Sequence, residues 1–166
     1  MIVAGIRVQF VCGQDLASQL ISWYGSGYGG FSHVDAVMPD GRLLGARDDA
    51  PDGSLAGVRI RPANYEVWAR QEVLELPAPH IVASKWVAWL YSQQGRPYDI
   101  GSIWGFILGR DLHQKGHWIC SQLQLEALEE CGLMPHLETP KQQVTPGSLR
   151  LMLLALGAKS ILKRNL

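Results

Sequence analysis

The stretch FSHVDAVMPDGRLLGAR, residues 31–47, is the segment that decides the fold. Two short apolar runs flank Pro39-Asp40-Gly41, which is typical of a tight turn. The pattern therefore predicts a β-hairpin, and His33 opens its first strand. Antiparallel pairing about this turn would bring Ala46 or Arg47 opposite His33.

A second segment, HWICSQL at residues 117–123, places Cys120 immediately before an amphipathic pattern. Apolar residues then recur on one face of a helix: Cys120, Leu123, Ala127, Leu128 and Cys131. Gly132 and Pro135 end the pattern. Cys120 is therefore expected in the first turn of a helix, where the positive end of the helix dipole favours a thiolate.

The alternative for Cys120 is a buried structural cysteine, because a free cysteine packs as a small apolar side chain. Position alone leaves both interpretations open. The other two cysteines fit the structural alternative better. Cys12 falls within a predicted strand, and Cys131 falls at the C-terminal end of the helix, where the dipole disfavours a thiolate.

The rest of the pattern predicts one α+β domain over residues 1–166, with a mostly antiparallel sheet packed against helices. Strands are expected over residues 6–11, 57–61 and 69–76, and helices over 15–24, 82–90 and 145–156. A glycine-rich loop at residues 25–30 is interpreted as a hinge that leads to His33. Trp86 and Trp89 lie at helical spacing and are expected in the core.

Composition and charge bear on the classes of partner and on the compartment to expect. The chain has 166 residues, 47% of them hydrophobic, and its 15 basic and 15 acidic residues give zero formal net charge. This balance gives no electrostatic reason to expect nucleic acid or a membrane surface. Three widely spaced cysteines favour a reducing compartment. With neither a signal-peptide layout nor a transmembrane-length apolar run, we expect a cytoplasmic protein, unless another route delivers it to the cell wall.

The order of these motifs resembles that of papain-like cysteine amidases and peptidases of the NlpC type, in their circularly permuted form. In the unpermuted family a Gly-x-Pro-Tyr stretch leads to a Cys-Ser at a helix start, and a Ser-His-Val strand follows. Here Gly95-Arg96-Pro97-Tyr98 leads to Cys120-Ser121, but Ser32-His33-Val34 comes first, as in the permuted branch. The resemblance spans about residues 13–135 and implies a papain-like fold.

The resemblance implies that Cys120 is the nucleophile and His33 the general base. The family carries a third polar residue about twelve residues past the histidine, where this sequence has Gly45. Some acceptor must still orient the imidazole. Asp35 is the first substitute, because it lies two residues after His33 and therefore on the same face of the strand.

Asp35 also has an alternative role, in which it faces solvent or pairs with Arg42 or Arg47. Weaker substitutes for the orienting residue lie after the hairpin: Arg47, Asp48 and Asp49.

No metal ion or organic cofactor is expected. His117 and Cys120 form only a His-x-x-Cys half-site, whereas zinc needs three or four ligands. His113 and His117 are expected at the rim of the cleft that holds Cys120. His80 and His136 are expected at the surface.

The resemblance implies hydrolysis of an amide bond in a cell-wall peptide of bacterial or phage context, through a thioester acyl-enzyme. A second class is an acyltransferase or thioesterase similar to lecithin retinol acyltransferase. Its acyl chain could contact residues that could equally be core: Trp104, Phe106, Ile107 and Leu108. The third class is a binding module that has kept the fold and lost turnover, and the glycine at position 45 is its main argument. The oligomeric state is left open.

Overall fold

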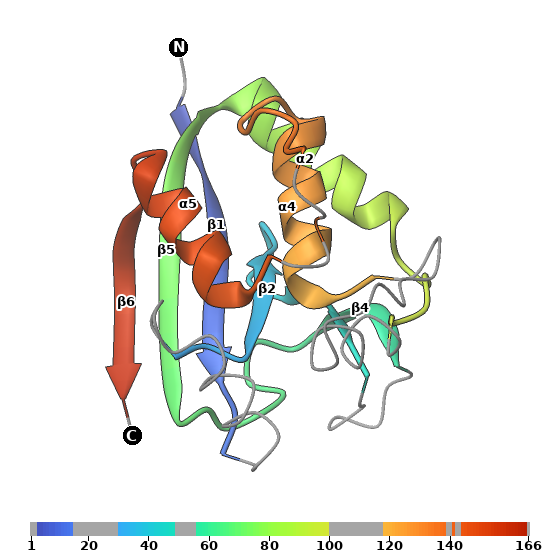
Figure 1. Cartoon of the computed structure of the whole chain (residues 1–166), viewed down its shortest axis with the longest axis vertical. Coiled ribbons are helices and arrows are strands. Elements are labelled where there is room, and N and C mark those ends of the chain that lie inside the picture. The colour runs from blue at the N-terminus through green and yellow to red at the C-terminus, as the bar shows by residue number, and fades with distance from the viewer. Residues whose placement is uncertain are drawn as a thin grey trace.

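The computed structural model describes residues 3–14, 30–48, 56–99, 118–138, 141 and 144–165. These residues form a six-stranded antiparallel sheet in the order β4-β3-β2-β1-β5-β6 (Figure 1). The strands are β1 (Val3–Cys12), β2 (His33–Val37), β3 (Leu43–Arg47), β4 (Gly57–Arg61), β5 (Arg70–Pro79) and β6 (Lys159–Asn165). The predicted α+β class with an antiparallel sheet is confirmed.

Three helices among the described residues pack against this sheet: α2 (His80–Ser92), α4 (Cys120–Glu130) and α5 (Pro146–Ala155). Alternate residues of β1, namely Ile6, Val8 and Phe10, join one apolar cluster with Leu123 and Leu128 of α4. The alternate apolar residues of β1 and the helically spaced apolar residues of α4 therefore pack together in a single core.

The predicted hairpin is confirmed as β2 and β3, with Ala36 opposite Leu44. Its turn closes through a hydrogen bond of 2.8 Å from the Gly41 N–H to the Met38 carbonyl. Gly41 has a φ of 83°, a conformation that glycine adopts without steric cost. Continuing the register toward the open end places Asp35 opposite Gly45 and His33 opposite Arg47.

The predicted helices at 82–90 and 145–156 correspond to α2 and α5. The Thr145 hydroxyl caps α5 by accepting a 3.1 Å hydrogen bond from the Ser148 N–H. Trp86 is buried and Trp89 packs against the core, as predicted. The predicted helix at 15–24 lies outside the described residues, as does the glycine-rich loop except for Gly30.

Two features of the sheet differ from the prediction. Strand β5 continues through Pro77 and Pro79 directly into α2, beyond the predicted end at residue 76. Strand β6, which was not predicted, pairs only with residues 70–75 of β5. The two prolines therefore lie where β5 has no β6 neighbour, and a missing N–H is tolerated there.

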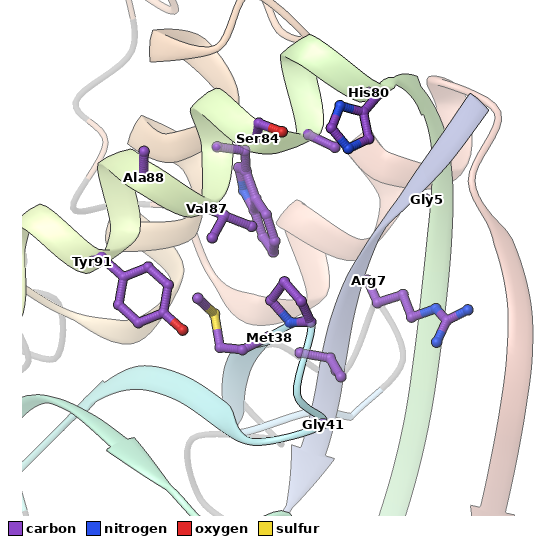
Figure 2. Close-up of a pocket in the computed structure, with 13 residues that line it drawn as sticks. Gly5, Arg7, Met38, Gly41, His80, Ser84, Val87, Ala88 and Tyr91 are labelled. Carbon is purple, nitrogen blue, oxygen red and sulfur yellow. The ribbon is translucent and has the colours of Figure 1, made fainter. Parts of the chain in front are cut away.

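A groove of about 620 Å³ lies between α2 and the β2–β3 turn (Figure 2). Its lining includes Met38 and Gly41 of the turn, Val87 and Tyr91 of α2, and Arg7 of β1. Cys120, His33 and Asp35 are not among the residues that line this groove. Within the described ranges, no helix is both long and apolar enough to cross a membrane.

Candidate active site

Cys120 is the first residue of α4, as the spacing predicted, and its side chain is buried. The residue before it, Ile119, supplies no side-chain hydrogen bond to the first turn, and that turn contains no acidic residue. Nothing in the first turn of α4 therefore offsets the positive end of the helix dipole. This end of α4 therefore favours a negatively charged group placed beside it.

The Gly-x-Pro-Tyr stretch lies beside the approach to this helix. The Trp118 N–H donates to the Pro97 carbonyl and the Asp99 N–H donates to the Trp118 carbonyl, each at 3.0 Å. Tyr98 and Trp118 form a parallel bridge. Two stretches that the sequence separates are therefore paired in space, and this pairing positions the first turn of α4.

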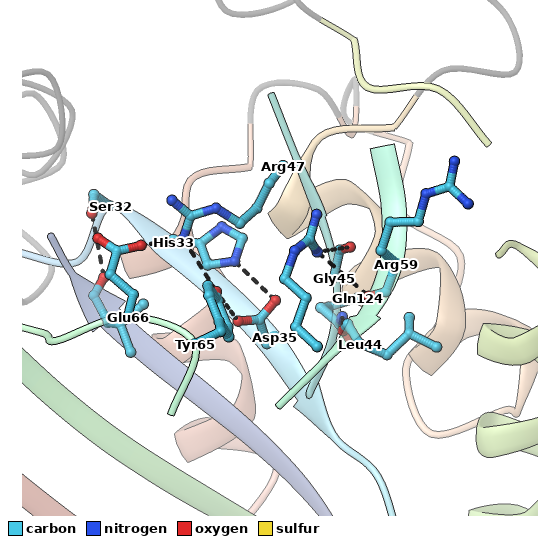
Figure 3. A network of polar contacts seen from close by, with 12 residues as sticks. Ser32, His33, Asp35, Leu44, Gly45, Arg47, Arg59, Tyr65, Glu66 and Gln124 are labelled. Carbon is cyan, nitrogen blue, oxygen red and sulfur yellow. Dashed lines mark hydrogen bonds and ion pairs between the residues drawn. The ribbon is translucent and has the colours of Figure 1, made fainter. Parts of the chain in front are cut away.

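His33 and Asp35 form the centre of the site (Figure 3). The Nε2 of His33 lies 2.8 Å from Asp35 Oδ1, and both side chains are buried. Cys120 is the second side chain, after Asp35, whose proximity raises the pKa of the imidazole. Because Nε2 faces Asp35, Nδ1 is the ring nitrogen left for Cys120. The three residues singled out from the sequence are thus brought together.

The electrostatics of the pair follow from burial and mutual attraction. Burial alone would lower the pKa of His33, but the charge and hydrogen bond of Asp35, followed by those of Cys120, raise it from 6.5 to about 9. Burial would raise the pKa of Asp35, but the charge and hydrogen bond of His33, the hydrogen bond from Tyr65 and the charge of Arg47 lower it. The geometry therefore favours an imidazolium beside a carboxylate.

Gly45 explains how Asp35 fits. A Cβ built on Gly45 would lie 1.8 Å from Asp35 Oδ1 and 3.0 Å from its carboxyl carbon. The Asp35 carboxylate therefore fills the space in which a side chain at position 45 would begin. Two neighbouring side chains fix the β3 backbone here. Arg61 donates to the Gly45 carbonyl at 3.2 Å, and Gln124 of α4 donates to the Leu44 carbonyl at 3.1 Å.

Residues between β4 and β5, which no sequence pattern singles out, complete the surroundings of this pair. The Tyr65 hydroxyl donates to Asp35 Oδ2 at 2.8 Å, and the Trp68 ring stacks on His33 with centroids 6.4 Å apart. Arg47, considered from the sequence as a weak orienting residue, contacts Tyr65 rather than bonding the imidazole. Tyr65 and Trp68 lie in an irregular segment whose sequence has neither helical nor strand periodicity. The one sequence signal that could have marked them is the spacing of two aromatic residues three positions apart.

The remaining candidates lie elsewhere. Cys12 and Cys131 are buried, and burial raises the pKa of Cys131. Asp48, His80 and His136 are exposed. Several predicted residues lie outside the described part of the chain: Asp49, Trp104, Phe106, Ile107, Leu108, His113 and His117. Among the residues that the structure describes, no cluster of three or more His, Cys, Asp or Glu side chains could hold a metal ion.

No protein-family model matches this chain, and no curated protein matches its sequence.

We predict that Gly45→Ala is destabilising because its Cβ would collide with the Asp35 carboxylate. The expected loss is about 1–3 kcal/mol in the free energy of unfolding, measured by urea denaturation. The matched control is the same change in an Asp35→Ala background, where the collision is absent and most of the loss should disappear. An equal loss in both backgrounds would show that Gly45 is required for another reason.

The pKa of His33 also predicts how stability depends on pH. Because its folded value of about 9 exceeds its ordinary 6.5, the contribution of the pair is complete below pH 6.5 and is lost as pH rises toward 9. The lowered pKa of Asp35 means that the contribution is also lost on acidification below 3.8.

The difference in Tm between the native protein and Asp35→Asn should therefore be largest between pH 3.8 and 6.5 and should shrink toward pH 9. Thermal melts followed by circular dichroism provide the measurement. A difference that stays constant up to pH 9 would mean that His33 is neutral throughout.

Proposed function

We propose that this protein is a cysteine hydrolase that cleaves amide bonds. Cys120 is the nucleophile, His33 the general base and acid, and Asp35 the residue that orients the imidazole. The observation that carries the proposal is that three side chains meet at the start of α4: His33 is hydrogen-bonded to Asp35, and Cys120 lies near enough to the imidazole to raise its pKa.

In the proposed reaction the Cys120 sulfur attacks the substrate carbonyl carbon. The backbone N–H of Cys120, at the helix start, donates to the oxygen that becomes negatively charged. The carbon–nitrogen bond then breaks, and His33 passes its proton to the leaving amine, which leaves a thioester on Cys120. Water attacks this thioester while His33 accepts the water proton, and the acid is released with the thiolate restored.

We assign the chain, within the same proposal, to the circularly permuted papain-like hydrolases of the NlpC type, with a cell-wall peptide of bacterial or phage context as substrate. Support comes from the order of the motifs and from the pairing of the Gly-x-Pro-Tyr stretch with Trp118. We also propose that the chain is kept in the cytoplasm, consistent with its free Cys12, Cys120 and Cys131, or reaches the wall by a separate route.

The geometry weakens the main argument for a catalytically inactive binding module. That argument was the glycine at position 45. Because the Asp35 carboxylate fills the space above Gly45 and lies 2.8 Å from His33, the imidazole keeps an acceptor without a side chain from β3. A thioesterase would use the same sulfur and imidazole and would differ from the amidase in its substrate, and an acyltransferase would differ also in passing the acyl group to an acceptor other than water.

We predict that iodoacetamide at pH 7 alkylates Cys120 before the other cysteines, because within the described part of the chain Cys120 alone interacts with an imidazole. Mass spectrometry after brief labelling provides the measurement. Cys131→Ala should leave the labelling rate of Cys120 unchanged. Labelling of Cys131 first, or of all three cysteines equally, would contradict the proposal.

Asp35→Asn should preserve folding and lower the rate of hydrolysis by roughly two orders of magnitude, because the imidazole loses its charged partner. Turnover of a cell-wall peptide amide and of an acyl ester, assayed in parallel, separates the amidase from the thioesterase. Unchanged turnover in Asp35→Asn would reject the role of Asp35. Failure of the native protein to turn over either substrate would favour the binding module.

A further inference from the structure

Asp35, which accepts the hydrogen bond from the His33 imidazole, is itself held in place by other side chains. The Arg47 Nη1 donates to the Tyr65 hydroxyl at 3.2 Å, and that hydroxyl lies 2.8 Å from Asp35 Oδ2 (Figure 3). Arg47 is anchored in turn by an ion pair of 2.9 Å with Glu66. Glu66 and Tyr65 come from the segment between β4 and β5, whereas Asp35 and Arg47 come from the hairpin.

The chemistry of these groups fixes the direction of every hydrogen bond. An arginine can only donate, so the Tyr65 oxygen accepts from Arg47 and its own proton must go to Asp35 Oδ2. Asp35 accepts a second hydrogen bond at Oδ1, and its donor is the Nε2–H of His33. The imidazole therefore carries its proton on Nε2 in both charge states. When His33 is neutral, its lone pair is on Nδ1, the nitrogen left for Cys120.

Aromatic rings also contact this arrangement. The Trp68 ring is stacked on His33 with an interplanar angle of 21° and meets Tyr65 edge-on, with centroids 5.3 Å apart. The guanidinium of Arg47 lies 5.3 Å from the Tyr65 ring centroid and 5.5 Å from that of Trp68. His33, Asp35, Tyr65, Arg47 and Trp68 thus form a closed ring of contacts, which opposes rotation of the imidazole.

We propose that Tyr65 is a positioning residue of this hydrolase, which acts through Asp35 to hold His33 in the tautomer that leaves Nδ1 free for Cys120. Arg47 directs the hydroxyl proton of Tyr65 toward Asp35. The catalytic role of Tyr65 rests on the proposed function. Its effect on the tautomer of His33 does not.

The surrounding charges are consistent with this role. Asp35 and Cys120 face the imidazole, Tyr65 and Arg47 face the carboxylate, and Arg61 lies 5.8 Å from the Tyr65 ring centroid. Burial, together with the negative charge of Asp35, raises the pKa of Tyr65 above its ordinary 10.0. Tyr65 therefore remains a hydrogen-bond donor over the pH range in which His33 titrates.

The test compares the native protein with Tyr65→Phe, which keeps the ring against Trp68 and removes only the hydroxyl. Tyr91→Phe is the matched control, because Tyr91 lines the separate groove beside α2. The first readout is the ¹⁵N NMR signature of neutral His33 above pH 9. We expect only the Nε2–H tautomer in the native protein and in Tyr91→Phe, and a mixture of both tautomers in Tyr65→Phe.

The second readout is the pH profile of Cys120 alkylation by iodoacetamide. We expect an upper inflection near pH 9, where His33 loses its proton. A loosened Asp35 stabilises the imidazolium less, so Tyr65→Phe should move this inflection down by about half a pH unit or more. At pH 7, where His33 is protonated in both proteins, the alkylation rate should change little.

Arg47→Met provides a second variant, because it frees the Tyr65 hydroxyl to rotate without removing it. It should show the same mixture of tautomers as Tyr65→Phe. Retention of the pure Nε2–H tautomer with an unchanged pH profile in both variants would overturn the inference. Because the NMR readout needs no substrate, it remains decisive even if the native protein hydrolyses nothing, an outcome that would reject the proposed function separately.

Discussion

The site depends on one interaction, the hydrogen bond between buried His33 and buried Asp35. A carboxylate that is 1% exposed is costly unless charged or hydrogen-bonding partners surround it. The imidazole, Tyr65 and the charge of Arg47 supply those partners, and Gly45 supplies the space. The arrangement of β2 and β3 and the segment before β5 can therefore be understood as the surroundings that this buried pair requires.

The fold brings Cys120, the proposed nucleophile, to this pair through backbone pairing and a few buried side chains. Trp118 pairs with the segment around Pro97 directly before α4, and Gln124 ties the helix to the backbone of β3. Leu123 and Leu128 then pack α4 into the core that β1 and β2 share. These contacts position Cys120, the first residue of α4, beside His33, the first residue of β2.

Periodicity explains which parts the sequence could predict. The turn at residues 39–41 and the apolar spacing of α4 are local signals, so the hairpin and the helix start at Cys120 were predictable. Alternation along β2 also placed Asp35 on the face of His33. The contacts of Tyr65 and Trp68 depend on the packing of an irregular segment, and β6 carries mixed charge and apolar residues, so neither showed a recognisable pattern.

The most direct test of the central claim is to trap a covalent intermediate on Cys120. The native protein would be mixed with an activated acyl ester, quenched in acid and analysed by intact and peptide mass spectrometry. The account predicts one acyl group per chain, located on Cys120, formed in a rapid burst by the native protein and much more slowly by Asp35→Asn. Acylation of Cys12 or Cys131 instead, or equal acylation of Cys120 in both proteins, would contradict it.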